Sequence, residues 1–211
     1  MAAPDTPPRT RILVWDAPVR VFHWLMVLCF ATAWLTGDSD RFALVHITAG
    51  YTMAGLVVFR LVWGVVGTRH ARFSAFVTGP ARVARYLRDL LRRRPAEHAG
   101  HNPAGALAIV ALLALTTVVT ATGWAVQVNL GGHTLEELHE SAANLMLALV
   151  GLHLAGVVVS SWLHRENLVR AMITGRKAGA PEEAITSSRL GVALLILAAV
   201  LAFWVWSWPR S

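Results

Sequence analysis

The chain has 211 residues, of which 55% are hydrophobic and 15% charged, and its formal net charge is +7. This composition, with a mean hydropathy of +0.53, excludes an ordinary soluble domain and indicates an integral membrane protein. Five apolar stretches are each close to the ~20 residues that a spanning helix needs. They cover residues 19–36, 43–66, 104–128, 141–163 and 190–208.

The first apolar stretch follows Arg9 and Arg11 and ends near Ala31-Thr32-Ala33, which also has the form of a cleaved signal peptide. We expect a retained span instead, because His23 and Trp24 are unusual in a discarded segment. The stretch also holds Cys29, the single cysteine of the chain. One cysteine excludes an internal disulfide and a C-x-x-C-H haem attachment site.

The connection after the second stretch contains a basic amphipathic pattern from Ala81 to Arg94, preceded by Thr78-Gly79-Pro80. A capping residue followed by proline is typical of a helix start. We predict that this helix lies in the cytoplasmic headgroup layer, with its arginines on anionic lipid. Docking of an acidic soluble partner is the alternative.

The last part of the chain is predicted to be an addition to a four-helix core. Residues 176–189 contain glycine, proline, serine and glutamate, which predicts a flexible linker. We therefore divide the chain into a transmembrane four-helix domain (1–175), a linker (176–189) and an added C-terminal transmembrane helix (190–211). The predicted fold class is an all-α integral membrane protein with five spans.

Positive charge predicts the orientation, because arginine and lysine are retained on the cytoplasmic side. Of the 19 arginines and lysines, all but Arg41 and Arg210 lie in or at the edge of the N-terminal segment, the second connection or the fourth connection, with Arg60 at the edge of the second. This places the N-terminus in the cytoplasm and the C-terminus in the periplasm of a bacterial inner membrane. The positive net charge is explained by topology, and no nucleic-acid partner is predicted.

Four histidines, His23, His46, His139 and His153, lie within or at the ends of these stretches, where a titratable ring is costly without a strong partner. His153 follows His139 by fourteen residues, about 21 Å along one helix. These two cannot share one iron, because axial ligands lie on opposite sides of the metal. Depth instead pairs His23 with His153 and His46 with His139, although His153 is about 10 Å deeper than His23 by this count. The sequence thus predicts two non-covalent, b-type haems stacked across the bilayer.

The four histidines also allow three interpretations without haem. A single intramembrane histidine is often only hydrogen-bonded to a neighbouring helix. A haem-free transporter would require carboxylates beside the histidines, and only Glu140, at an edge, comes near. A passive membrane anchor for a dehydrogenase complex is the third possibility. Haem content separates all of these from a cytochrome.

Five segments of the chain, taken together, resemble a known family. They are Trp15-Asp16-Ala17-Pro18-Val19-Arg20-Val21-Phe22-His23-Trp24, Val45-His46-Ile47-Thr48-Ala49-Gly50-Tyr51, Phe59-Arg60-Leu61-Val62-Trp63-Gly64, Leu138-His139-Glu140 and Gly151-Leu152-His153. The resemblance is to the superfamily of prokaryotic cytochrome b-561 and the nickel-iron hydrogenase cytochrome b subunit. The resemblance covers roughly residues 12–175 and depends on the joint spacing of the segments. It implies a four-helix, di-haem membrane cytochrome whose ligands are the same four histidines. The fifth helix departs from the plainest family pattern.

Several polar residues are weaker candidates for contact with a cofactor. Arg60 either pairs with a haem propionate or extends toward the membrane surface. His101 resembles a histidine beside the haems of this family, and its alternative role is to help Asn102 start a helix. His70, His98 and His164 lie on the same side and are expected at the surface. His133, Glu136, Glu137 and Glu140 form a small acidic cluster in an outward connection, where a solvated loop is expected.

No catalytic residues are predicted, because the sequence contains no nucleophile triad, phosphate-binding glycine loop or H-E-x-x-H pattern. Iron with two histidine ligands has no open position, which favours electron transfer over oxygen activation. The resemblance to this family implies that the electrons pass between the quinone pool and a redox partner, a c-type cytochrome or a dehydrogenase or hydrogenase. Activity as a quinone oxidoreductase and formation of a homodimer are left open.

Overall fold

The computed structural model describes residues 10–77, 79–92 and 100–208. The predictions for Arg93, Arg94, His98 and Arg210 lie outside these ranges. The elements in chain order are β1 (Thr10–Leu13), α1 (Ala17–Thr36), η1 (Asp40–Phe42), α2 (Ala43–Val66), α3 (Phe73–Phe76), α4 (Pro80–Leu91), α5 (Pro103–Gln127), α6 (Gly132–Leu163), α7 (Leu168–Thr174), β2 (Arg176–Gly179), η2 (Pro181–Glu183) and α8 (Leu190–Ser207).

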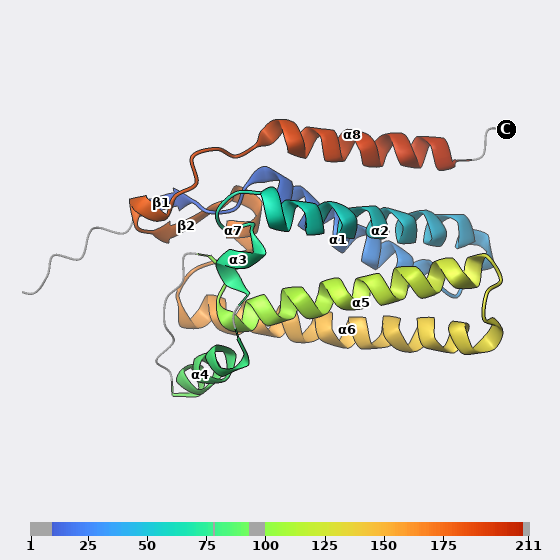
Figure 1. Cartoon of the computed structure of the whole chain (residues 1–211), viewed down its shortest axis with the longest axis horizontal. Coiled ribbons are helices and arrows are strands. Elements are labelled where there is room, and N and C mark those ends of the chain that lie inside the picture. Colours follow the sequence, from blue (N-terminus) through green and yellow to red (C-terminus); the bar gives the residue numbers. More distant parts are fainter. Residues whose placement is uncertain (1–9, 78, 93–99, 209–211) are drawn as a thin grey trace, which may run out of the picture.

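Within the described residues, five segments are long and apolar enough to cross a membrane: α1, η1 with α2, α5, α6 and α8. They run side by side, as Figure 1 shows. Large apolar side chains remain exposed on all of them, as expected for surfaces that contact lipid tails. The predicted all-α integral membrane fold is confirmed.

The helices pack as a series of neighbours. α2 packs against both α1 and α5, α5 packs against α6, and α8 packs on α1 and more lightly on α2. α1 and α6 are not among the closely packed pairs of the described chain. α1 and α6 are therefore connected through α2 and α5 rather than by close packing against each other.

One end of the bundle carries an addition that the sequence analysis did not predict. β1 pairs antiparallel with β2, with Thr10 opposite Gly179 and Leu13 opposite Arg176. The prediction of a flexible linker is thus wrong for residues 176–183, which form β2 and the short helix η2. Backbone hydrogen bonds to the N-terminal strand compensate for a composition that favours disorder. We call the end of the bundle with β1, β2 and α7 the cap end, and the opposite end, with loops 37–39 and 128–131, the loop end.

α6 begins at Gly132, nine residues before the apolar stretch that predicted it. Its first turns carry His133, Glu136 and Glu137, whose side chains are exposed. Helical hydrogen bonding does not stop where the apolar surface stops, so the helix extends beyond the hydrophobic stretch at the loop end.

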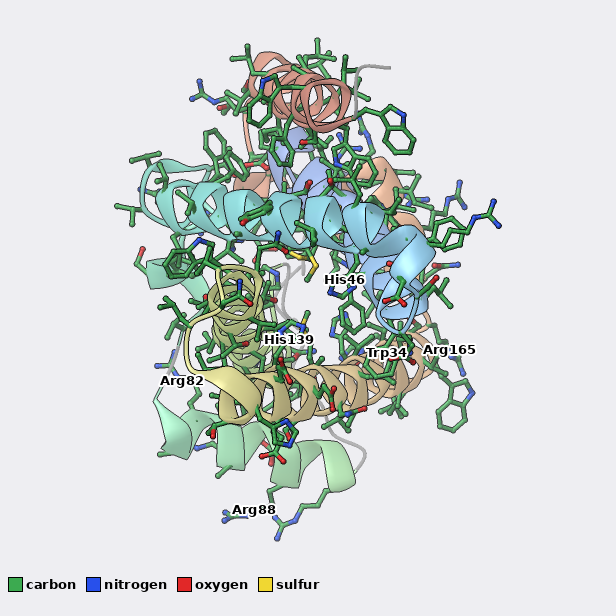
Figure 2. All side chains as sticks on the ribbon, turned by 90° about the vertical axis from the view of Figure 1, so that its right-hand side faces the viewer. Trp34, His46, Arg82, Arg88, His139 and Arg165 are labelled. Carbon is green, nitrogen blue, oxygen red and sulfur yellow. The ribbon has the colours of Figure 1, made fainter. Side chains whose placement is uncertain are left out.

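α4 confirms the predicted amphipathic helix. Figures 1 and 2 both place α4 beside the cap end of α6, running across the direction of the spans. Tyr86 is buried, and Arg88 points away from the bundle in Figure 2. Burial raises the pKa of the Tyr86 hydroxyl.

Candidate functional site

The loop end brings two of the four predicted histidines together. His46 comes from the first turn of α2 and His139 from the second turn of α6, and their ring centroids are 6.1 Å apart at an interplanar angle of 77°. Figure 2, viewed from the loop end, shows both side chains directed toward the interior of the bundle. An imidazole nitrogen lies ~2 Å from a bound transition metal, so two rings on opposite sides of one ion have centroids roughly 6 Å apart.

The outer ring nitrogens of this pair are held by backbone carbonyls of neighbouring helices. His46 Nδ1 lies 2.8 Å from the Ala33 carbonyl of α1, and His139 Nδ1 lies 3.0 Å from the Val119 carbonyl of α5. A carbonyl only accepts, so each Nδ1 carries the proton and donates it. Each Nε2 is then left with a free lone pair, the form in which imidazole binds a metal.

Two residues around His139 were missed by the sequence analysis. Thr122 Oγ1 lies 3.3 Å from His139 Nδ1, and its own proton is donated to the Val118 carbonyl at 2.8 Å. At Gly123, an added Cβ would lie 2.9 Å from His139 Cε1. The ring therefore needs a glycine at this position of α5. A glycine within an apolar helix carried no signal that distinguished it from an ordinary packing position.

His23 and His153 belong to the cap end of the same bundle. They come from the second turn of α1 and the last third of α6, and they are near enough to interact electrostatically. His23 packs edge-on against Trp24, with 5.1 Å between ring centroids. Its Nδ1 is buried and has no hydrogen-bond partner among the described residues. A buried, unsatisfied ring nitrogen fits a site that is completed by a ligand.

Arg60 also lies at the cap end, fourteen residues and about 21 Å along α2 from His46. It is only 2% exposed, so it does not extend to the membrane surface as one of its two predicted roles required. Its guanidinium carbon is 4.7 Å from the ring centroid of Phe73 and 5.9 Å from that of Phe76. The Nη1 group is buried without a hydrogen-bond partner in the described chain.

His101 lies directly before α5, between Trp15 and Phe76, with ring centroids 4.4 Å and 4.5 Å away. The helix start is capped by Asn102, whose Oδ1 accepts from the Gly105 N–H at 2.7 Å. Burial lowers the pKa of His101 to about 3, and the nearby charges of Arg60 and Lys177 act in the same direction. The ring is therefore neutral at neutral pH, and its buried Nδ1 has no partner among the residues that the structure describes.

Asp16, which the sequence analysis did not single out, joins the helices at the cap end. It is 1% exposed, and its Oδ1 accepts from the Val19 N–H at 2.8 Å, which caps α1. Its Oδ2 accepts from Trp63 Nε1 at 3.0 Å and from Thr68 Oγ1 at 2.7 Å. The order Asp-x-Pro before an apolar run is a helix-start signal that could have identified the cap. It could not have identified the two bonds from distant residues.

The remaining histidines lie away from both pairs or in structural contacts. His70 Nε2 is 2.7 Å from the Glu183 carbonyl, and His164 Nδ1 is 2.9 Å from the Ser160 carbonyl. His133 is exposed and lies 3.5 Å from Glu136 and 3.2 Å from Glu137. No group of three or more histidine, cysteine or acidic side chains that could hold a metal ion occurs among the described residues. The donors thus suit a cofactor that brings its own equatorial ligands, as haem does.

An apolar layer separates the two pairs. Cys29, Ala49, Met53 and Met146 are buried together, with partly buried residues of α5 and Trp204 of α8 around them. Such a layer excludes water between the two ends of the bundle. The arrangement suits two separate planar cofactors at different depths.

Comparison with known proteins agrees with this chemistry. The profile of the family described as prokaryotic cytochrome b561 matches residues 14–175. A probable Ni/Fe-hydrogenase B-type cytochrome subunit of Rhodobacter capsulatus is 25% identical over 217 residues, covering 80% of this chain and 82% of the relative. The probable Ni/Fe-hydrogenase 1 B-type cytochrome subunit of Escherichia coli (strain K12) is 28% identical over 140 residues, covering 53% and 58%.

No solved structure matches the chain significantly. The family profile covers far more than half of the sequence, and it includes all four histidines. The protein therefore belongs to the prokaryotic cytochrome b561 family, as a multi-pass membrane cytochrome of b type that works in electron transfer.

Proposed function

We propose that the chain binds two haem b groups, one between His23 and His153 and one between His46 and His139, and carries electrons across the membrane. The observation that carries the proposal is the loop-end pair, whose ring centroids are 6.1 Å apart. Both Nδ1 groups of that pair are hydrogen-bonded to backbone carbonyls, which leaves the Nε2 lone pair of each ring available to bind a metal.

Haem iron supplies one-electron redox chemistry when it is bound. The protein's part is to hold and orient the ligands, to exclude water between the two sites, and to set the charges around each. Two histidines on each iron leave no position for oxygen or substrate. An electron relay is therefore the function that this arrangement supports best.

The electron donor and acceptor are proposed to be a quinone and a redox protein. Several relatives are named as Ni/Fe-hydrogenase cytochrome subunits, which favours a hydrogenase over a c-type cytochrome as the protein partner. Co-purification of the tagged chain from its native membrane tests this choice. A homodimer is tested by the mass of the detergent-solubilised complex.

The orientation is proposed from charge. With the cap end in the cytoplasm of a bacterial inner membrane, the exposed arginines of α4 (Arg82, Arg85 and Arg88) and Arg92 directly after it meet anionic headgroups. α4 runs across the spanning helices, as an interfacial helix does (Figures 1 and 2). Labelling of single cysteines at Arg88 and at His133, with Cys29 replaced by alanine, tests which end faces the cytoplasm.

The proposal on the haems is tested by pyridine haemochrome quantitation of the purified chain and of His23→Ala and His46→Ala. We expect about two haems in the wild type and about one in each variant. His133→Ala, which changes an exposed histidine at the loop end, is the matched control and keeps both. Folded wild-type protein with one haem or none would contradict the proposal.

A further inference from the structure

The cap end contains a buried positive charge whose anion is not supplied by the described residues. Arg60 is 2% exposed, and its Nη1 has no hydrogen-bond partner in the part of the chain that the structure describes. Burying a guanidinium is costly unless its donors are matched by a negative acceptor. The phenyl rings of Phe73 and Phe76 stabilise it through their faces, which leaves the in-plane N–H groups of Nη1 without an acceptor among the described residues.

Asp16 is the carboxylate that influences Arg60 electrostatically, but its hydrogen bonds go to other groups. Val19, Trp63 and Thr68 all donate to it, and no ion pair joins it to Arg60 among the described residues. Asp16 therefore holds the helix ends together and does not accept the free hydrogen bonds of the Arg60 guanidinium.

His101 supplies a second unsatisfied group beside the first. Its ring centroid is 4.5 Å from that of Phe76, the same ring that faces Arg60, and its buried Nδ1 has no partner within the described chain. His153 is among the groups that interact electrostatically with His101. Two potential donors, one charged and one neutral, thus lie near the His23 and His153 pair and far from His46.

We propose that Arg60, with His101, binds a propionate carboxylate of the haem held by His23 and His153. This inference rests on the proposed function, and it orients that haem with its carboxylate edge toward the start of α5. A carboxylate accepts two parallel N–H bonds from a guanidinium, which matches the missing partner in charge and geometry. Nδ1 of neutral His101 donates to the same carboxylate.

The test is a redox titration of one-haem proteins. In a His46→Ala background, which keeps only the cap-end site, Arg60→Gln is expected to lower the midpoint potential of the remaining haem. Loss of a positive charge disfavours the reduced, more negative form of the cofactor. In a His23→Ala background the same substitution is expected to leave the potential unchanged. Arg72→Gln, which removes an exposed arginine from the same end, is the matched control.

Two further experiments distinguish a direct bond between Arg60 and a haem carboxylate from a general effect of the Arg60 charge on the midpoint potential. When the full chain is reconstituted with the dimethyl ester of haem, which has no carboxylates, Arg60→Gln is expected to cause a smaller shift than with haem itself, because only the through-space effect of the charge remains. Arg60→Lys keeps the charge but not the paired donors, and His101→Phe keeps the packing between Trp15 and Phe76. Both should give smaller shifts than Arg60→Gln and in the same direction.

An equal shift with haem and with its dimethyl ester overturns the proposal, because the charge then acts without a carboxylate. An unchanged potential of the cap-end haem in Arg60→Gln and Arg60→Lys also overturns it. Failure of the proposed function is distinguished from these outcomes, because it appears as missing haem before any change at Arg60.

Discussion

The two histidine pairs differ in how the protein surrounds them. At the loop end, the ring nitrogens of His46 and His139 are held by backbone carbonyls of α1 and α5. At the cap end, Nδ1 of His23 has no hydrogen-bond partner among the described residues, and Arg60 and Lys177 are buried close enough to His101 to act on it electrostatically. The proposed ligands at the loop end are thus oriented by backbone carbonyls, whereas the cap end holds buried charged side chains, so the two ends surround the same residue type differently.

Among substitutions that distinguish the two ends of the bundle, Gly123→Ala is expected to have the largest effect, on haem content. An added Cβ would lie 2.9 Å from His139 Cε1, and the bonds of that ring to Val119 and Thr122 prevent it from moving aside freely. We expect haem content to fall from about two toward one, with only the cap-end haem left. Gly191→Ala, on α8, is the control, because its Cβ would contact nothing within 4 Å. Two haems in Gly123→Ala would show that His139 is not a ligand in this ring position.

Asp16→Ala changes the cap end alone. It removes the N-terminal cap of α1 and leaves Trp63 Nε1 and Thr68 Oγ1 without their acceptor. We expect the free energy of unfolding to fall by about 3 kcal/mol, measured by thermal or detergent denaturation. Asp38→Asn, at an exposed position of the loop end, is the control and should change it little. Equal stability of the two variants would contradict a structural role for Asp16.

The different surroundings also predict the order of the two midpoint potentials. Hydrogen bonds from Nδ1 to carbonyls make His46 and His139 stronger electron donors, which stabilises oxidised iron. The positive charge of Arg60 stabilises reduced iron at the cap end. The haem retained in His46→Ala should therefore titrate at a higher potential than the haem retained in His23→Ala. The reverse order in the two one-haem proteins would contradict this comparison.

Trp204→Phe is expected to have the smallest effect, because it touches neither pair. Trp204 Nε1 donates to Thr52 Oγ1 at 2.9 Å, which fixes α8 to α2. Loss of this bond should reduce stability by about 1 kcal/mol and leave both haems in place. Trp206→Phe, at a residue that is 73% exposed, gives the matched control without a measurable change. Loss of a haem in Trp204→Phe would instead assign α8 a role in cofactor binding.

The spans and the histidine positions could be predicted because both follow from local patterns. Apolar length identifies a membrane helix, and a rise of about 1.5 Å per residue separates His139 from His153. The approach of His46 to His139 agrees with the pairing by depth. The carbonyl partners at Ala33 and Val119 could not be predicted, because they depend on how neighbouring helices are rotated.

The cap could not be predicted for a related reason. β1 has four residues, and its partner β2 is more than 160 positions away in a segment whose composition favours a loop. Neither strand has a pattern of its own, and each is stabilised by the other and by contacts such as the bond from the Ile185 N–H to the Leu13 carbonyl at 2.9 Å. Arg60 could be suspected from its motif, whereas its burial follows from Phe73 and Phe76 packing over it.

The most direct test of the central claim is the haem content of double histidine variants, measured by pyridine haemochrome. If the pairs are His23 with His153 and His46 with His139, then His46→Ala/His139→Ala should retain about one haem, and so should His23→Ala/His153→Ala. Variants that change one histidine of each pair, such as His23→Ala/His46→Ala, should retain none. One haem in a cross-pair variant, or none in a same-pair variant that remains folded, would contradict the account.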